Sequence, residues 1–256
     1  MVFELRDTSK VEKLFAGWQE TLIWSCLQGV MGNIYVTSLE EPESAVAWLG
    51  DFCFFAGKPE KELLLHQPDW KENIFRIMTP RTKEWETLIE ETFGEQAIRC
   101  TRYAIKKEPE IFDKEKLQSI VKGLPVEYEI RRMDRELFEY SKKTDWCMDW
   151  VSQYDSYEMY EKWGLGVLIL KDGAVVAGAS SYSSYQGGIE IEIDTKEEYR
   201  RKGLAYICGA KLILECLERG WYPSWDAQNR WSVALAEKLG YHFEYAYPIY
   251  EIYGDE

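Results

Sequence analysis

The chain has 256 residues, of which 46% are hydrophobic and 15% aromatic, with 11 Trp and 17 Tyr. A chain of this length and composition can bury a substantial core, which excludes intrinsic disorder and fits one or two domains. Its 45 Asp and Glu against 31 Lys and Arg give a formal net charge of −14. This charge argues against nucleic acid and membrane partners and favours a small cationic ligand.

The cysteines and the N-terminus indicate the compartment. Six cysteines are widely spaced without a Cys-x-x-Cys pair, and the N-terminal residues lack the pattern of a cleaved signal peptide. No stretch approaches the length of a membrane span, and no His-Glu-x-x-His motif or cysteine cluster indicates a metal. We therefore expect a reduced, cytoplasmic protein without a metal site.

The first half opens with an amphipathic helix, predicted over 11–30 and closed by Gly29 and Gly32. The next predicted elements are a strand at 33–38, strand material with a glycine break at 45–57, a helix at 83–93 and a strand at 101–106. The segment 106–125 is charged, interrupted by Pro109, Gly123 and Pro125, and carries a short helical pattern at 114–121. We therefore expect one domain at 1–115, a linker at 116–125 and a second domain at 126–256.

The second half contains a longer series of elements. They are a strand at 127–133, a helix-rich stretch at 135–160, strands at 166–171, 174–182 and 189–195, a helix at 204–217, a strand at 222–226, a helix at 229–239 and a strand at 241–253. The Asp172-Gly173 dipeptide between two apolar runs predicts a hairpin. The order β-α-β-β-β-α-β-α-β predicts an α/β (α+β) layer arrangement.

A basic, glycine-containing loop precedes the helix at 204–217. Arg200, Arg201 and Lys202 place three cations beside a helix start, and Gly203 removes a side chain there. Helix starts expose amides without internal partners, so the loop predicts an anion site suited to a pyrophosphate. On the loop alone, a turn glycine beside a solvated basic surface explains the pattern equally well.

Carboxylates alternate with isoleucines along the strand at 189–195. One face carries Ile189, Ile191 and Ile193, and the other carries Glu190, Glu192 and Asp194. Three carboxylates on one face repel each other unless they are solvated or matched by cations. The row is either a solvent-facing surface or a functional cluster.

The chain from 126 to the C-terminus resembles the Gcn5-related N-acetyltransferases, the GNAT superfamily. Arg200-x-x-Gly203-x-Ala205 fits the Arg/Gln-x-x-Gly-x-Gly/Ala signature, and the hairpin before it and the run from Asn229 to Tyr241 after it match neighbouring family blocks. With its extra N-terminal domain, the chain looks like the two-domain acetyltransferases grouped with zwittermicin A resistance proteins. The resemblance implies a mixed, mostly antiparallel sheet flanked by helices, preceded by a diverged GNAT-like or accessory α/β domain.

The resemblance also implies acetyl-CoA as the acyl donor. Backbone of the fourth strand of the family pairs with the pantetheine arm, and amides of the signature loop hold the pyrophosphate. Carried onto this chain, the donor-binding residues are Ile193, Asp194, Thr195, Arg200, Arg201, Lys202, Gly203, Leu204, Ala205, Asn229 and Ser232. Asn229 fits a plain helix cap equally well.

Catalysis in this family requires a proton to leave the ammonium group of the acceptor. Strand carboxylates can take that proton if burial or like charge raises their pKa, and Glu190 and Glu192 are the candidates. The Tyr that protonates the leaving thiolate in many family members is replaced by Ala236. Tyr241 or Tyr245 supplies the proton instead, or the thiolate leaves unassisted.

These observations predict an acyltransferase that acetylates the amine of a small, cationic, antibiotic-like substrate. The alternative is a non-catalytic CoA-binding module. The N-terminal part has the element order of a diverged partial copy but no Arg-x-x-Gly-x-Gly/Ala loop. We therefore expect it to bind no donor and either to pack on the C-terminal domain or to shape the acceptor cleft of that domain. The sequence leaves a homodimer open.

Overall fold

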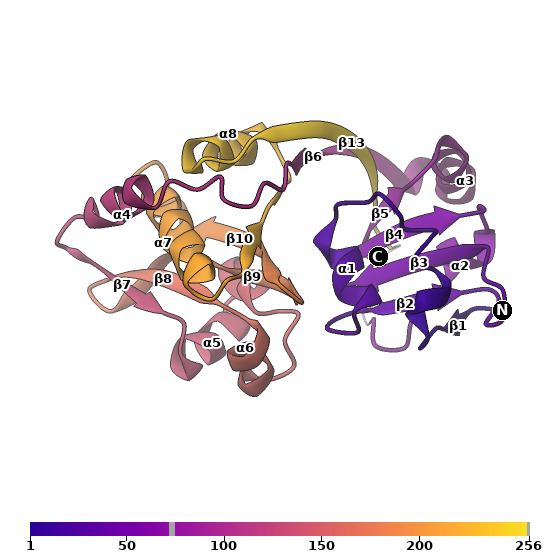
Figure 1. The fold of residues 1–256 in the computed structure, drawn as a ribbon, viewed down its shortest axis with the longest axis horizontal. Coiled ribbons are helices and arrows are strands. Elements are labelled where there is room, and N and C mark those ends of the chain that lie inside the picture. The colour runs from indigo at the N-terminus through magenta and orange to yellow at the C-terminus, as the bar shows by residue number, and fades with distance from the viewer. Residues whose placement is uncertain (72–74, 255–256) are drawn as a thin grey trace. The chain divides into compact units, whose positions relative to one another are not determined.

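The computed structural model describes residues 1–71 and 75–254 (Figure 1). Mostly antiparallel sheets flanked by helices confirm the predicted fold class. The chain forms two compact units: unit 1 comprises Met1–Arg102 with Ala246–Glu256, and unit 2 comprises Tyr103–Tyr245. Within the described residues, no helix combines the length and apolar character needed to cross a bilayer.

The unit boundaries differ from those expected between 115 and 126. They fall inside two strands, β6 (Ala97–Ile105) and β13 (Phe243–Ile252). Most of the expected linker is helix α4 (Lys114–Lys122), which packs against another helix of unit 2 and buries Leu117 in its core. The charged residues of this segment lie on the exposed side of α4, which explains why its composition resembles a linker.

Unit 1 contains a sheet in which the strand pairs are antiparallel except for one parallel pair. Its elements are β1 (Phe3–Glu4), α1 (Thr21–Leu27), β2 (Asn33–Val36), β3 (Ser44–Leu49), β4 (Phe52–Gly57), α2 (Lys61–Leu65), β5 (Arg76–Pro80) and α3 (Lys83–Phe93). Strands β4 and β5 pair in parallel from Phe52↔Ile77 to Phe55↔Pro80. The end of β13 completes the sheet, because Tyr250, Glu251 and Ile252 pair with β5.

The predicted helix at 11–30 is largely wrong. Only α1 is helical, and the residues before it form a short 3-10 helix (Thr8–Lys10) and turns. Gly17 takes a φ of 81°, which ends any helix that starts upstream. Val11, Phe15 and Trp18 are nevertheless buried, so the apolar spacing reflects packing of turns rather than one continuous helix.

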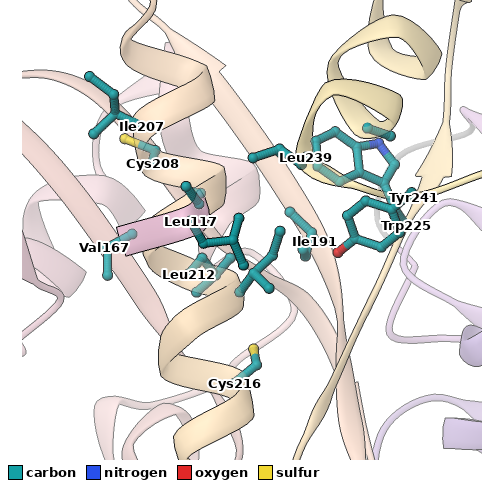
Figure 2. Packing of buried hydrophobic residues seen from close by; sticks show 14 of the residues in the cluster. Leu117, Val167, Ile191, Ile207, Cys208, Leu212, Cys216, Trp225, Leu239 and Tyr241 are labelled. Carbon is teal, nitrogen blue, oxygen red and sulfur yellow. The ribbon is translucent and has the colours of Figure 1, made fainter. Parts of the chain in front are cut away.

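Unit 2 is a five-stranded sheet with a long helix on one face. The strands are β7 (Tyr128–Arg132), β8 (Gly166–Lys171), β9 (Ala174–Tyr185), β10 (Gly188–Thr195) and β11 (Tyr222–Ser224), in the order β11-β10-β9-β8-β7. Helix α7 (Leu204–Glu218) packs against β8, β9, β10 and β11. Figure 2 shows Ile207, Cys208, Leu212 and Cys216 of α7 beside Ile191, Trp225 and Tyr241 in this core. The predicted apolar face of the isoleucine strand is therefore confirmed.

The opposite face of this sheet carries α5 (Arg135–Lys142), the 3-10 helix η3 (Asp145–Trp150) and α6 (Tyr157–Trp163). Ala177 and Ala179 face the α7 core, whereas a Cβ built on Gly178 would meet the Trp150 ring at 2.6 Å. Successive strand residues point to opposite faces, so η3 covers the face that Glu192 and Asp194 also share. The missing side chain of Gly178 makes room for the indole.

The two units repeat one order of elements. Each has an antiparallel series of strands whose last member, β4 or β10, pairs in parallel with the strand that follows a helix, β5 or β11. Unit 2 then continues through β12 (Asp226–Ala227), paired with the end of β6, and α8 (Arg230–Leu239). Unit 1 is therefore topologically a copy of unit 2, in which the helix after β4 has 5 residues where α7 has 15.

Candidate active site

Strand β10 has an edge that is only partly paired. It pairs with β9 from Gly188 to Thr195, but with β11 only from Gly188 to Glu190. The last pair is Glu190↔Ser224, after which β11 ends. Beyond Glu190, the β11-side edge of β10 is open among the described strands, and an extended ligand could pair there as an added strand.

The loop after β10 turns sharply into α7. Arg201 has a φ of 62° and Gly203, the N-cap of α7, a φ of 79°. Left-handed residues within a tight turn gather backbone N–H groups into a concave anion site. The amides of the first turn of α7 add further donors, because the first intrahelical bond of this turn is made by the N–H of Ile207 to the Gly203 carbonyl, at 3.2 Å.

Open space lies over Gly203. A Cβ built there would meet no atom of the described structure within 4 Å, so backbone conformation rather than crowding requires a glycine. The space belongs to a pocket of about 550 Å³. The residues lining it are Thr195, Tyr199, Arg200, Arg201, Gly203, Leu204, Ala205, Tyr206, Leu235 and Lys238. The end of β10, the turn and the start of α7 therefore meet at one cavity.

Six predicted donor-binding residues line this pocket, and the others lie elsewhere. Ile193 and Asp194 are on the open part of β10, and Lys202 stacks its Nζ over the Tyr199 ring at 4.6 Å. Asn229 Oδ1 accepts a hydrogen bond from the Ser232 amide at 3.0 Å, so Asn229 is the helix cap of α8. The Ser232 hydroxyl accepts the Trp225 Nε1–H at 2.9 Å. Contact of Asn229 and Ser232 with the donor stays a prediction.

Four pocket residues were not predicted from the sequence. Tyr199 precedes the basic run, Tyr206 lies on the first turns of α7, and Leu235 and Lys238 come from α8. Leu235 and Lys238 are three positions apart and therefore share one helix face. That spacing is visible in the sequence, but it does not indicate which surface the face meets.

Asp194 has a raised pKa and a hydrogen-bond partner at this site. The Trp150 Nε1–H donates to its Oδ2 at 3.1 Å. Burial and the nearby charge of Asp149 raise the Asp194 pKa to about 6, against the lowering effects of Trp150 and Arg200. A carboxyl group with this pKa changes protonation close to neutral pH.

Glu190 and Glu192 differ in environment. Glu190 is 6% exposed and lies at the closed end of the open edge, paired with Ser183 of β9 and Ser224 of β11. Glu192 is partly exposed and pairs with Ser180. The two carboxylates therefore differ in their access to solvent, because Glu190 is buried and Glu192 is only partly so.

The structure also locates the candidate general acids. Ala236 is fully buried in the core, and the Tyr241 hydroxyl donates to the Pro223 carbonyl at 2.7 Å. Burial raises the pKa of Tyr241 well above its usual value. Tyr245 is 39% exposed on β13. Tyr241 is therefore neutral and held at β11, the strand that ends beside Glu190.

Together, the open strand edge and the amide-rich helix start form a place where an extended ligand with an anionic end could bind. Among known proteins, the model of the family described as GNAT acetyltransferase matches residues 12–250. The chain belongs to the GNAT acetyltransferase family, which confirms the predicted resemblance. The family is one of acyltransferases.

Individual relatives span different shares of the chain. The protein named uncharacterized N-acetyltransferase YdfB, from Bacillus subtilis (strain 168), is 31% identical over 169 residues, 65% of this chain and 62% of that protein. The match thus covers less than two thirds of that relative's length. A GCN5-related N-acetyltransferase-like protein of Streptococcus suis is 45% identical, with a TM-score of 0.90 over 96% of this chain and 98% of the other.

More distant structures share the fold alone. A GCN5-related N-acetyltransferase from Sphaerobacter thermophilus has a TM-score of 0.57 at 14% identity, covering 98% of this chain and 95% of the other. A tandem GNAT protein from the clavulanic acid biosynthesis pathway has a TM-score of 0.56 at 10% identity, with full coverage of both chains. The likeness over the whole of a tandem protein agrees with the repeated element order of units 1 and 2.

Proposed function

We propose that the chain transfers the acetyl group of acetyl-CoA to the amine of a small cationic substrate, and that unit 2 binds both reactants. One observation carries this proposal: the open edge of β10 and the left-handed turn before α7 meet at the same pocket. An ordinary strand-turn-helix connection requires neither feature.

We assign the pyrophosphate of the donor to the turn before α7 and its pantetheine arm to the open edge of β10. The amides from Arg201 to Ala205 would hold the pyrophosphate, because the left-handed turn and the helix start present N–H groups and partial positive charge. The Arg200 Nε–H donates to the Thr195 carbonyl at 3.3 Å, which ties this cation to the end of β10. Backbone of Ile193, Asp194 and Thr195 would pair with the extended pantetheine arm. The thioester would then point along β10 toward Glu190.

The chemistry requires one proton to leave the acceptor before its nitrogen can attack. The ammonium gives this proton to Glu190 or Glu192, and the amine lone pair then forms a bond with the thioester carbonyl carbon. The carbon–sulfur bond breaks with its electron pair moving to sulfur, the attacking nitrogen releases its second proton to solvent and becomes the neutral amide, and the CoA thiolate takes up a proton. Tyr241 or Tyr245 supplies that last proton, or it comes from solvent.

A cationic acceptor is supported by the acidic surroundings. Asp194 and Asp149 lie near each other, and Trp146 and Trp150 of η3 pack edge to face with ring centroids 5.1 Å apart. Carboxylates next to indole rings attract organic cations. The net charge of −14 acts in the same direction at longer range. An antibiotic-like amine fits this description.

Unit 1 is not expected to bind a donor. Its β4 pairs with β5 at four of its six residues, whereas β10 pairs with β11 at only three of its eight, so β4 offers a shorter free edge to an extended ligand. The helix that follows, α2, has five residues and begins without a left-handed glycine. We propose that unit 1 binds no acetyl-CoA and that both reactants bind to unit 2.

Two measurements on the full chain test the proposal. Isothermal titration should show acetyl-CoA binding, and release of free CoA thiol should follow when primary alkyl amines, diamines or amino sugars are added. Binding without thiol release for every amine would support the alternative, a non-catalytic CoA-binding module. Absence of binding at millimolar acetyl-CoA would overturn both.

A further inference from the structure

The pocket beside α7 extends beyond its anion-binding turn. The turn from Arg200 to Gly203 forms one wall, and the first turn of α7 and the last turns of α8 add Tyr206, Leu235 and Lys238. Cavities of about 300–1,000 Å³ hold whole drug-sized molecules, and this one has a volume of about 550 Å³. It therefore has room for more of a ligand than a pyrophosphate held by backbone amides.

Two hydrogen bonds hold the end of α8 at this pocket. The Lys238 carbonyl accepts one from the Tyr206 hydroxyl at 3.4 Å and one from the Lys116 Nζ at 3.0 Å. Tyr206 belongs to α7 and Lys116 to α4, so the last turn of α8 is tied to two other helices of unit 2 (Figure 1). The position of Lys238 at the pocket wall is therefore set by three helices and not by α8 alone.

The side chain of Lys238 carries a charge that the protein does not neutralise. Lys196 pairs with Glu198 at 3.1 Å and Lys211 with Glu215 at 2.6 Å, whereas Lys238 forms no ion pair with any residue in 1–71 or 75–254. Its side chain is exposed, so a ligand in the pocket can reach the ammonium group. An unpaired cation on a pocket wall attracts an anionic group of the ligand.

The walls formed by α7 and α8 match the end of the proposed donor that the turn does not hold. Beyond its pyrophosphate, CoA carries an adenine ring and a ribose with a 3′-phosphate. The half-buried side chains of Tyr206 and Leu235 offer a surface on which a base can pack. The ammonium group of Lys238 suits a phosphate monoester, which carries almost two negative charges near neutral pH.

We infer that Lys238 binds the 3′-phosphate of the donor and makes the pocket selective for CoA over 3′-dephospho-CoA. Of the three cations that line the pocket among the described residues, Arg200 and Arg201 belong to the turn, and Lys238 comes from a separate helix. The inference rests on the proposed function, because it assigns the second end of the same ligand. Lys238 determines donor specificity and takes no part in the chemistry, since the 3′-phosphate and the thioester are at opposite ends of acetyl-CoA.

Calorimetry of the full chain with CoA and with 3′-dephospho-CoA tests this role, because the two ligands differ only in the 3′-phosphate. The wild-type protein should bind CoA about tenfold more tightly, the effect of one charged hydrogen bond that is open to solvent. Lys238→Met should weaken CoA binding about tenfold and leave 3′-dephospho-CoA binding unchanged, so the preference is lost. Lys238→Arg keeps the charge and should retain the preference.

Lys122→Met is the matched control, since it removes an exposed lysine of unit 2 that does not line the pocket. This variant should keep the wild-type preference. Equal affinities of the wild type for the two ligands, or a preference that survives in Lys238→Met, would overturn the role of Lys238 and leave donor binding in place. Loss of the preference in Arg201→Met but not in Lys238→Met would place the 3′-phosphate at the turn and overturn it as well. If neither ligand binds at millimolar concentration, the proposed function itself fails.

Discussion

The Nε1–H of Trp150 donates a 3.1 Å hydrogen bond to Oδ2 of Asp194, which fixes a carboxyl group with a pKa of about 6 on the open part of β10. The usual pKa of an aspartate side chain is 3.8. The folded protein therefore holds the Asp194 proton more tightly than the unfolded chain does. Asp194 therefore favours folding fully below about pH 4, and this contribution is lost as the pH rises through about 6.

Asp194→Asn should remove the cost of ionising this group. We expect the free energy of unfolding to rise by about 1–2 kcal/mol at pH 8 and to be unchanged at pH 4. Urea unfolding at the two pH values measures both. Asp155→Asn, at an exposed position, serves as the control. An equal gain at both pH values would show that charge is not the cause.

Glycine at the start of α7 can be tested against glycine at its end. Gly203→Glu places a carboxylate over the backbone amides of the turn before α7 and should abolish acetyl-CoA binding in calorimetry. Gly220→Glu is matched to it, because Gly220 also has a left-handed φ, 70°, and open space around its Cα. It should keep the affinity within about threefold. Equal loss in both variants would assign the effect to backbone strain.

Replacement of the catalytic base should separate chemistry from donor binding. If Glu190 is the base, Glu190→Gln should lower kcat by about 10²-fold or more and leave the acetyl-CoA affinity nearly unchanged. If Glu192 is the base instead, Glu192→Gln should have the same effect. Glu129→Gln, at an exposed position of β7, is the control. The wild-type kcat/KM should fall at low pH with a single ionisation. Near-normal kcat in both variants would mean that the amine arrives neutral or loses its proton to water.

The C-terminal strand should stabilise unit 1. Tyr250 is fully buried among Trp85, Ile89 and Met78, and its hydroxyl donates to Glu90. Tyr250→Ala should lower the free energy of unfolding by about 3–5 kcal/mol, the range for a buried aromatic side chain. Tyr253→Ala, three residues later and 50% exposed, should change it by less than about 0.5 kcal/mol. Similar urea midpoints for the two variants would contradict this role.

Local patterns predicted much of unit 2. The hairpin at Asp172-Gly173, the alternating strand and the helix after Gly203 are each determined by residues close in sequence, and β8, β9, β10 and α7 agree with them. The basic loop also lies beside a pocket, as its composition indicates. Helix α3 begins at Lys83 and ends at Phe93, as its apolar spacing and Gly94 predict.

Features that depend on distant partners could not be read from the sequence. The strand at 76–80 is short and ends in Pro80, and it is recognisable only by its pairing with β4 and β13. Ser183 and Ser224 are 41 positions apart, and only the registers of β9 and β11 against β10 bring them to either side of Glu190. The packing of α4 within the expected linker depends on a distant partner too, because the apolar side of this helix is revealed only by its contact with α7.

The strand pairings also bear on how the chain is made. The sheet of unit 1 includes residues 250–252, and the β12 strand of unit 2 pairs with residues 103 and 104, which precede the rest of that unit. A nascent chain that has released residues 1–102 still lacks the last strand of unit 1 until roughly 150 further residues are synthesised, on the order of ten seconds or more. During that interval the edge of β5 has no β13 to cover it. Completion of the N-terminal unit therefore waits for the synthesis of residues 250–252, and a ribosome that stops before them leaves the sheet of unit 1 unfinished.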